Sequence, residues 1–255
     1  MTALLDVRDL NVTFGATTVL NGVSLHLDAG ETLAVLGESG CGKSVTAQAI
    51  MGILDSPPAR VTGSVHLRGR DLLRLPERER RRIRGREMAM VFQDALSALN
   101  PVFTVGYQIA ETLRVRDGLA RREALARAVE LMDLVRIPAA RGRVHDYPHQ
   151  FSGGMRQRVT IPMALALDPA VLIADEPTTA LDVTVQAQIL DLLAELRRER
   201  NMALLLITHD LGVVAEVADR IAVMYDGRVV EDTDVYSLYR APRHPYTREL
   251  LGRVR

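Results

Sequence analysis

Residues Gly37 to Ser44 read Gly-Glu-Ser-Gly-Cys-Gly-Lys-Ser, the most informative stretch of this chain. It follows an apolar run from Thr32 to Leu36 and precedes a segment of helical character from Val45 to Leu54. A strand, a glycine-rich turn and a helix in this order build a phosphate-binding loop, in which backbone N–H groups surround the phosphates of a nucleotide. The stretch therefore predicts an α/β protein that binds ATP or GTP.

The residue types of this loop suit that chemistry. A Cβ atom at Gly37 or Gly42 would obstruct the approach of the main chain to phosphate oxygens. The Lys43 ammonium can neutralise the outer phosphates, and the Ser44 hydroxyl can hold Mg²⁺. A glycine turn with a chance Gly-Lys-Ser is the alternative, and the flanking strand and helix argue against it. The predicted nucleotide contacts in the loop are Gly37, Glu38, Ser39, Gly40, Cys41, Gly42, Lys43, Ser44 and Val45.

A second nucleotide element lies downstream, where the apolar run from Ala170 to Ala174 ends in Asp175 and Glu176. Such a run fits a buried parallel strand, and ligands of open α/β sheets sit at the carboxyl ends of these strands. Asp175 is expected to hold Mg²⁺ through water, and Glu176 is expected to polarise the attacking water. The alternative is a solvated strand end with ordinary charges.

A third motif lies between these two, where Phe151-Ser152-Gly153-Gly154-Met155-Arg156-Gln157-Arg158 precedes an apolar helical stretch. Together with the loop and the acidic strand, it resembles the signature motif of the ATP-binding cassette ATPases. Ser152 is expected to cap a helix, so that Gly153 and Gly154 expose N–H groups to an anion. A Ser-Gly-Gly hinge between two helices is the structural alternative.

The resemblance implies a second subunit, because in that family the signature closes over the nucleotide held by another chain. Met155 stands where many members carry Gln, but the peptide-importer branch commonly has Met there. Asp182 matches the loop that crosses the dimer interface. The residues expected at the partner's ATP are therefore Ser152, Gly153, Gly154, Met155 and Asp182.

The resemblance also implies roles for residues that would be weak indications alone. Gln93 matches the loop that joins the ATPase core to the helical subdomain, where it can sense Mg²⁺ and the attacking water. His209 matches the switch histidine that contacts the γ-phosphate, and Phe14 falls where an aromatic ring stacks on adenine. The expected catalytic residues are Glu176, His209, Gln93 and Lys43, and those expected at Mg²⁺ are Ser44, Gln93 and Asp175.

Three further stretches resemble the ATPases of the dipeptide, oligopeptide and nickel importers. They are Gln93 to Pro101, Asp146 to Arg158, and Arg243 to Thr247. The resemblance implies the energising subunit of an importer of di- or oligopeptides, with a second and related ATPase, two permease chains and an extracytoplasmic binding protein as partners. Many members of the group carry an extension with iron–sulfur cysteines, and no such cluster is expected in this chain.

Composition agrees with this interpretation. The chain has 255 residues, equal numbers of basic and acidic side chains and no tryptophan, so no nucleic-acid partner is expected. It carries no signal pattern and no apolar stretch of the roughly 20 residues that span a bilayer, which predicts a cytoplasmic protein held at the membrane through its partners. The single cysteine, Cys41, fits a reducing compartment, and its place beside Lys43 predicts a lowered thiol pKa.

The predicted architecture is a single domain over 1–255, with a P-loop NTPase (RecA-like) core, an antiparallel β subdomain and a helical signature subdomain. The core with its β subdomain is expected over 1–94 and 167–255, and the helical subdomain over 95–166. Strands at Leu33, Val171, Leu204 and Ile221 are expected to form the parallel core. The groove near Gln93 and the following Asp94 to Asn100 is the expected contact for a short helix of the permease.

Two other functions stay open at this point. One is a non-transport cassette ATPase, although such proteins usually join two cassettes or carry long coiled-coil inserts. The other is a mainly regulatory nucleotide-binding subunit, which forms one weakly active and one active ATP site with its partner. Against it, the expected catalytic and metal-binding residues are all present, namely Lys43, Gln93, Asp175, Glu176 and His209. Within the importer interpretation, peptides, nickel chelates and other small solutes all remain possible cargo.

Overall fold

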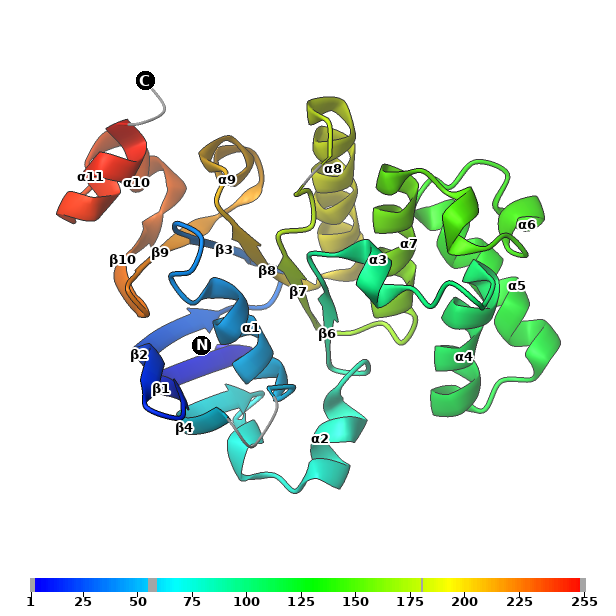
Figure 1. Cartoon of the computed structure of the whole chain (residues 1–255), viewed down its shortest axis with the longest axis horizontal. Coiled ribbons are helices and arrows are strands. Elements are labelled where there is room, and N and C mark those ends of the chain that lie inside the picture. Colours follow the sequence, from blue (N-terminus) through cyan, green and yellow to red (C-terminus); the bar gives the residue numbers. More distant parts are fainter. Residues whose placement is uncertain (1–2, 55–58, 180, 253–255) are drawn as a thin grey trace.

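The computed structural model describes residues 3–54, 59–179 and 181–252, with the backbone alone at residues 96 and 97. Figure 1 shows a mixed sheet in the middle, a smaller antiparallel sheet with α1 (Lys43–Met51) on one side of it, and a lobe of helices beyond β6 (Met88–Val91). The expected α/β class and its three parts are thereby confirmed. The phosphate-binding stretch lies where the central sheet meets α1.

The central sheet has six strands in the order β10-β9-β3-β8-β7-β6. Every neighbouring pair is parallel except β9 with β10, which run antiparallel. The four strands expected at the core are present, and the short β6 adds a fifth parallel strand that the sequence analysis does not assign. The strand bounds are β3 Thr32–Leu36, β6 Met88–Val91, β7 Val171–Asp175, β8 Ala203–Thr208, β9 Arg220–Tyr225 and β10 Arg228–Asp234.

The antiparallel sheet has four strands in the order β2-β1-β4-β5. Its apolar side chains alternate with polar ones, as expected when one face is buried and the other is solvated. The buried face packs against the central sheet in one apolar cluster that also includes Ala47 and Ile50 of α1. The strand bounds are β1 Leu5–Phe14, β2 Thr17–Leu27, β4 Ala59–Leu67 and β5 Arg70–Asp71.

Helices cover the remaining faces, and none within the described residues is long and apolar enough to cross a bilayer. Those of the lobe beyond β6 are α3 Ala95–Ala98, α4 Val105–Asp117, α5 Arg121–Leu134, α6 Ala140–Arg143 and α7 Gly153–Leu165. The others are α2 Glu77–Ile83, α8 Val183–Arg200, α9 Leu211–Val217, α10 Val235–Arg240 and α11 Pro245–Gly252, with short 3₁₀ turns at Leu72–Arg74 and Pro148–Gln150.

The central strands are apolar on both faces, and the two faces serve different cores. In β7, Val171 and Ile173 point toward the antiparallel sheet, whereas Leu172 and Ala174 point toward the helical lobe. This alternation follows from the two-residue period of a strand. The helical lobe therefore shares its core with the sheet, so α7 is fixed against the strands that carry the acidic residues.

Pro162 lies in the interior of α7, where a proline lacks the N–H that would reach the carbonyl of Arg158. Such a position costs about 3 kcal/mol relative to alanine in an isolated helix. The helix continues to Leu165 because Val159, Ile161 and Leu165 are buried in the lobe's core. Nothing in the structure gives Pro162 a functional role.

Candidate nucleotide site

The site lies at the carboxyl ends of four neighbouring parallel strands. The loop from Gly37 to Gly42 follows β3, His209 follows β8, Glu176 follows β7 and Gln93 follows β6. Because β3, β8, β7 and β6 are adjacent in the sheet, these residues meet along one edge. Open α/β sheets bind ligands at this edge.

The loop holds a buried cation at its centre. The Lys43 side chain is 4% exposed, and its ammonium donates to the carbonyl oxygens of Gly37 at 2.8 Å and Glu38 at 2.9 Å. Lys43 is the only lysine in the chain, in which every other basic side chain apart from histidine is an arginine. A compact ammonium held by loop carbonyls is available to bind an anion that enters the loop.

The glycines of the loop fit a phosphate-binding loop. Backbone conformation and packing against β9 require them, in addition to the expected close approach of the main chain to phosphate. Gly42 has φ +104° and Gly40 has φ +84°, so both lie in the left-handed region. A Cβ at Gly37 would lie 2.4 Å from the carbonyl oxygen of Met224, so this glycine is needed for packing against β9. Gly42 precedes α1 without a side-chain cap, which leaves the N–H groups of the first turn for a ligand.

Ser44 and Asp175 form a pair of oxygen donors beside the loop. The Ser44 hydroxyl donates to Asp175 Oδ1 at 3.0 Å. Burial raises the pKa of the Asp175 carboxyl, and the charge of Glu176 adds to this, while the Ser44 hydrogen bond and Lys43 oppose it. One hydroxyl and one carboxylate next to a phosphate-binding loop match the way Mg²⁺ is usually bound, with few protein ligands and substrate phosphates.

Glu176 is the centre of a cluster drawn from all four strand ends. Its carboxylate accepts hydrogen bonds from Gln93 Nε2 at 3.0 Å and Thr179 Oγ1 at 2.8 Å. His209 Nδ1 lies 3.4 Å and Lys43 Nζ 4.0 Å from the other carboxylate oxygen. The backbone of Glu176 has φ +44°, an uncommon conformation that its N–H supports by donating to Ile207. The arrangement positions a carboxylate that can accept a proton from water.

The signature residues belong to the helical lobe, and Gly153 lines the same hollow as Gln93 and Thr179 of this cluster. Ser152 caps α7 by accepting from the N–H of Met155 at 3.4 Å, as expected. Ser152 and Gly153 are exposed, whereas a Cβ at Gly154 would lie 2.5 Å from Val185. Asp182 caps α8 by accepting from the N–H of Val185 at 3.0 Å. The two motifs therefore lie side by side, with the start of α7 open to solvent.

Phe14 lies on the antiparallel sheet. It ends β1, pairs with Thr17 and Ala59, and packs half-buried against the core between the two sheets. Val45 packs half-buried against the same core.

The expectation of a lowered thiol pKa at Cys41 is wrong. Burial raises the pKa of this thiol above its ordinary value of 9.0, and the nearby charge of Lys43 only partly opposes the increase. The sulfur lies between the loop and the core, where the neutral thiol is favoured. Proximity to one cation in the sequence did not reveal this burial.

Thr179 is a site residue that the sequence analysis leaves without a role. Its hydroxyl, three residues after Glu176, donates to that carboxylate. The spacing of three residues between this hydroxyl and the expected catalytic carboxylate is the sequence feature that could have predicted the contact. The hydroxyl of Tyr246 accepts a hydrogen bond from the N–H of Glu38 in the loop at 3.1 Å, and in the sequence this residue appeared only as a family marker.

A phosphate-binding loop, a carboxylate pair at a parallel strand end and a polar cluster around the second carboxylate define a P-loop nucleoside triphosphatase. The profile described as ABC transporter matches residues 20–179. The chain therefore belongs to the ABC transporter family, as an ATPase of the ATP-binding cassette type.

Individual relatives agree with this assignment. The oligopeptide transport ATP-binding protein OppD of Bacillus subtilis is 52% identical over 99% of this chain and 72% of its own length. The dipeptide transport ATP-binding protein DppD of the same organism is 50% identical over 100% of this chain and 77% of its own length. A dimeric structure of the ATP-binding cassette MJ0796 bound to ADP and Pi aligns with a TM-score of 0.80 and 27% identity, over 91% of this chain and 98% of that chain.

Proposed function

We propose that the chain is the ATP-hydrolysing subunit of an importer for di- or oligopeptides, held on the cytoplasmic face of the membrane by its partners. The observation that carries the cargo class is the similarity to OppD and DppD, at 52% and 50% identity over nearly the whole chain. The clustering of Gln93, Thr179 and His209 around Glu176 supports active hydrolysis over a purely regulatory role.

In this proposal each residue of the cluster has a defined task. Glu176 accepts a proton from the water whose oxygen attacks the terminal phosphorus of ATP, while the bond to the ADP oxygen breaks. Gln93 and Thr179 hold the carboxylate, and His209 and Lys43 stabilise the charge on the transferred phosphate. Ser44, Asp175 and Gln93 would hold Mg²⁺, which neutralises phosphate oxygens when it is bound. Phe14 stacks on the adenine.

The signature acts on a second nucleotide in the partner subunit. The exposure of Ser152 and Gly153 at the start of α7 supports this, because the first N–H groups of a helix lack partners within the helix and can bind an anion. Met155 and Asp182 complete this surface. The partner is a related but distinct ATPase subunit, as in the importer group that the sequence resembles, and two ATP molecules are enclosed between the two chains.

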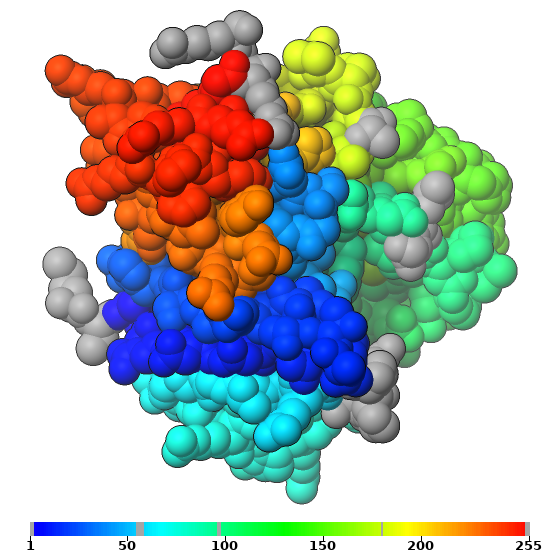
Figure 2. Space-filling model, turned by 60° about the vertical axis from the view of Figure 1, so that its left-hand side comes forward, coloured from blue at the N-terminus to red at the C-terminus, as the bar shows by residue number. Residues whose placement is uncertain are grey.

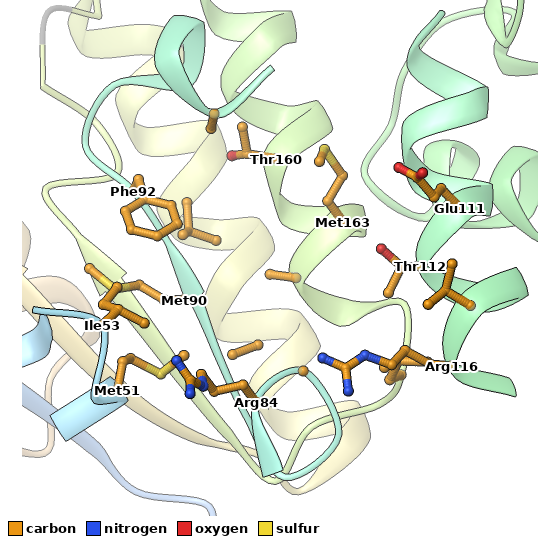
Figure 3. Close-up of a pocket in the computed structure, with 17 residues that line it drawn as sticks. Met51, Ile53, Arg84, Met90, Phe92, Glu111, Thr112, Arg116, Thr160 and Met163 are labelled. Atoms are coloured by element: carbon orange, nitrogen blue, oxygen red, sulfur yellow. The ribbon is translucent and has the colours of Figure 1, made fainter. Parts of the chain in front are cut away.

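The permease contact is a groove of about 580 Å³ between the ATPase core and the helical lobe. Figure 3 shows Met51, Met90 and Phe92 on the core side, facing Thr112 and Arg116 of α4 across the groove. Phe92 and Ala98, on either side of the expected Gln93 loop, line this groove, whereas Gln93 itself lines another hollow together with Gly153. The division into 1–94 with 167–255 and 95–166 places the groove at the boundary between two subdomains.

The chemistry of the groove fits a short permease helix. Phe92 is 41% exposed and Val115 is 74% exposed, so the walls offer apolar surface to a partner. Arg84 and Arg116 line the same groove, and Figure 3 shows both at one end of it. Because Arg84 already pairs with Glu77 and Glu111 also lines the groove, the occupant is defined by its apolar face, a helix that packs against Phe92 and Val115.

The experiment that tests this function traps the complex in its native cells. Tagged Glu176→Gln protein is kept in the presence of ATP and purified from detergent-solubilised membranes. Mass spectrometry then identifies the proteins that co-purify with it. We expect two permease chains and a second ATPase, with a peptide-binding protein encoded or recovered alongside them. Recovery in the soluble fraction with ribosomes or DNA enzymes would overturn the proposal, and a companion binding protein for nickel chelates would change the cargo.

A further inference from the structure

The Gly37–Glu38 peptide is held at both of its polar ends by side chains from opposite parts of the sequence. Its carbonyl, on Gly37, accepts from Lys43 Nζ at 2.8 Å. Its N–H, on Glu38, donates to the Tyr246 hydroxyl at 3.1 Å, although Tyr246 lies 208 residues away. A peptide unit is planar, so a hydrogen bond at each end fixes the orientation of the whole unit. Tyr246 thereby acts on the carbonyl that Lys43 contacts.

Tyr246 is itself held rigidly. It is 8% exposed and packs in the apolar cluster formed by β3, β9 and the C-terminal helices. Its ring lies 4.3 Å, centroid to centroid, from the ring of Tyr225 at the end of β9. The packing of the ring against β9 and the rest of this cluster therefore fixes the position of the hydroxyl.

A carboxylate anchors the segment that carries Tyr246. Glu231 on β10 accepts from the N–H groups of Arg243 at 2.8 Å and His244 at 2.9 Å. Burial alone would raise the pKa of Glu231, but the nearby Thr247 side chain, the hydrogen bonds from these two N–H groups and the charge of Arg243 outweigh it and lower the pKa. The segment before α11 is thus fastened to the sheet by its backbone.

The same region supports the loop at two further places. The carbonyl of Cys41 accepts from the N–H of Gly227 at 3.1 Å, and Gly37 packs directly against Met224. In Figure 2 the red C-terminal helices, the orange β9–β10 region and the blue segment after β3 meet on one face of the molecule. The phosphate-binding loop is therefore supported from behind by the C-terminal part of the chain.

We propose that Tyr246 is a positioning residue of the nucleotide site, which holds the Gly37–Glu38 peptide so that the loop keeps its shape when Lys43 turns toward phosphate. Lys43 cannot keep both hydrogen bonds to the loop carbonyls at full strength while it also binds the outer phosphates, so the loop needs a second support. Once the ammonium turns away, the hydroxyl of Tyr246 still holds the peptide. The inference rests on the proposed assignment of this loop as the ATP site.

The test is Tyr246→Phe in the full chain, which keeps the ring and removes the hydroxyl. Loss of one hydrogen bond of this kind predicts ATP binding weaker by about 2- to 10-fold. Selective isotope labelling of lysine gives a direct reading of the loop, because Lys43 is the only lysine and produces a single side-chain NMR signal. We expect that signal to shift in Tyr246→Phe before any nucleotide is added.

Tyr236→Phe is the matched control, because Tyr236 lies exposed on α10 and its hydroxyl only accepts from Arg240. If Tyr246→Phe and Tyr236→Phe match the wild type in ATP affinity and in the Lys43 signal, the positioning role is refuted. If the wild type itself binds no ATP, the proposed function fails instead. Should Tyr246→Phe not fold, Glu231→Gln loosens the same anchor, and unchanged ATP affinity and Lys43 signal in that variant would refute the role equally.

Discussion

The side-chain amide of Gln93 donates to the carboxylate of Glu176 at 3.0 Å, which joins the loop after β6 to the end of β7. The same loop leads through α3 into the helical lobe. The hydrogen bond therefore connects the proposed catalytic base with the part of the chain that borders the proposed permease groove. Movement of the lobe relative to the sheet would change the geometry of this hydrogen bond.

Replacing Gln93 by alanine tests this connection. Without the amide, the Glu176 carboxylate keeps the Thr179 hydrogen bond but loses one of its two neutral donors. We expect kcat for ATP hydrolysis to fall by about 10- to 100-fold, the cost of misplacing a catalytic group, with ATP affinity changed little. Phosphate release and equilibrium ATP binding measure the two quantities. Asp191→Ala, at an exposed position on α8, should leave both unchanged.

Replacing Glu176 by glutamine tests the proton acceptor. Glutamine keeps the size of the side chain and removes the basic oxygen, so hydrolysis should slow by roughly 10²- to 10⁴-fold while ATP remains bound. Single-turnover hydrolysis and nucleotide binding distinguish the two effects. Glu216→Gln removes an exposed carboxylate from α9 and serves as the control. A Glu176→Gln protein that hydrolyses ATP at the wild-type rate would show that another group is the base.

The sequence predicts the parts of this site that lie in contiguous motifs. Lys43, Ser44, Asp175 and Glu176 stand beside apolar runs whose length and punctuation already indicate strands and a helix. The strand β6 was not predicted because a run of only five apolar residues before Gln93 is compatible with a strand and with a helix. Contacts between residues that lie far apart in the sequence were the hardest to predict.

Two features illustrate why. The sign of the Cys41 pKa shift depends on how deeply packing buries the sulfur, and a neighbouring lysine in the sequence does not report that depth. The contact between Glu38 and Tyr246 spans most of the chain and follows no local pattern. Tertiary packing decides both, so neither could be derived from spacing.

Cys41 gives a test of the loop that needs no mutation, because it is the only cysteine. Since burial raises its pKa above 9.0, the thiolate fraction at neutral pH is smaller in the folded protein than in the unfolded chain. Alkylation should therefore be slow at neutral pH, accelerate as the pH rises beyond 9.0, and be slowed further by MgATP. Rates in denaturant provide the reference. Faster alkylation of the folded than of the denatured protein at neutral pH would contradict this assignment.

The proposed permease groove can be tested at Val115, which is 74% exposed on α4. Val115→Asp places an unpaired carboxylate where an apolar helix face would dock, and burying it would be costly. We expect recovery of the permease complex to fall at least about tenfold, while the isolated subunit binds ATP normally. Val115→Ala, which stays apolar at the same position, should retain the complex. Equal recovery with Asp and Ala would exclude this part of the groove from the contact.

The anchor at Glu231 makes stability depend on pH in a defined direction. Its folded-state pKa lies below the ordinary 4.5, so the carboxylate stabilises the fold above 4.5 and loses that contribution as the pH falls through the folded-state value. Glu231→Gln should lower the free energy of unfolding by on the order of 1–3 kcal/mol at neutral pH, because charge-assisted hydrogen bonds are lost.

The pH dependence separates this interaction from a general effect of substitution. The stability difference between wild type and Glu231→Gln should be full at neutral pH and disappear in acid, because protonation removes the same charge from the wild type. Glu216→Gln, on the exposed face of α9, lacks this anchoring contact and serves as the control. Thermal unfolding across the pH range measures the difference. A gap between wild type and Glu231→Gln that stays constant into acid would mean that shape, and not charge, holds Arg243 and His244 in place.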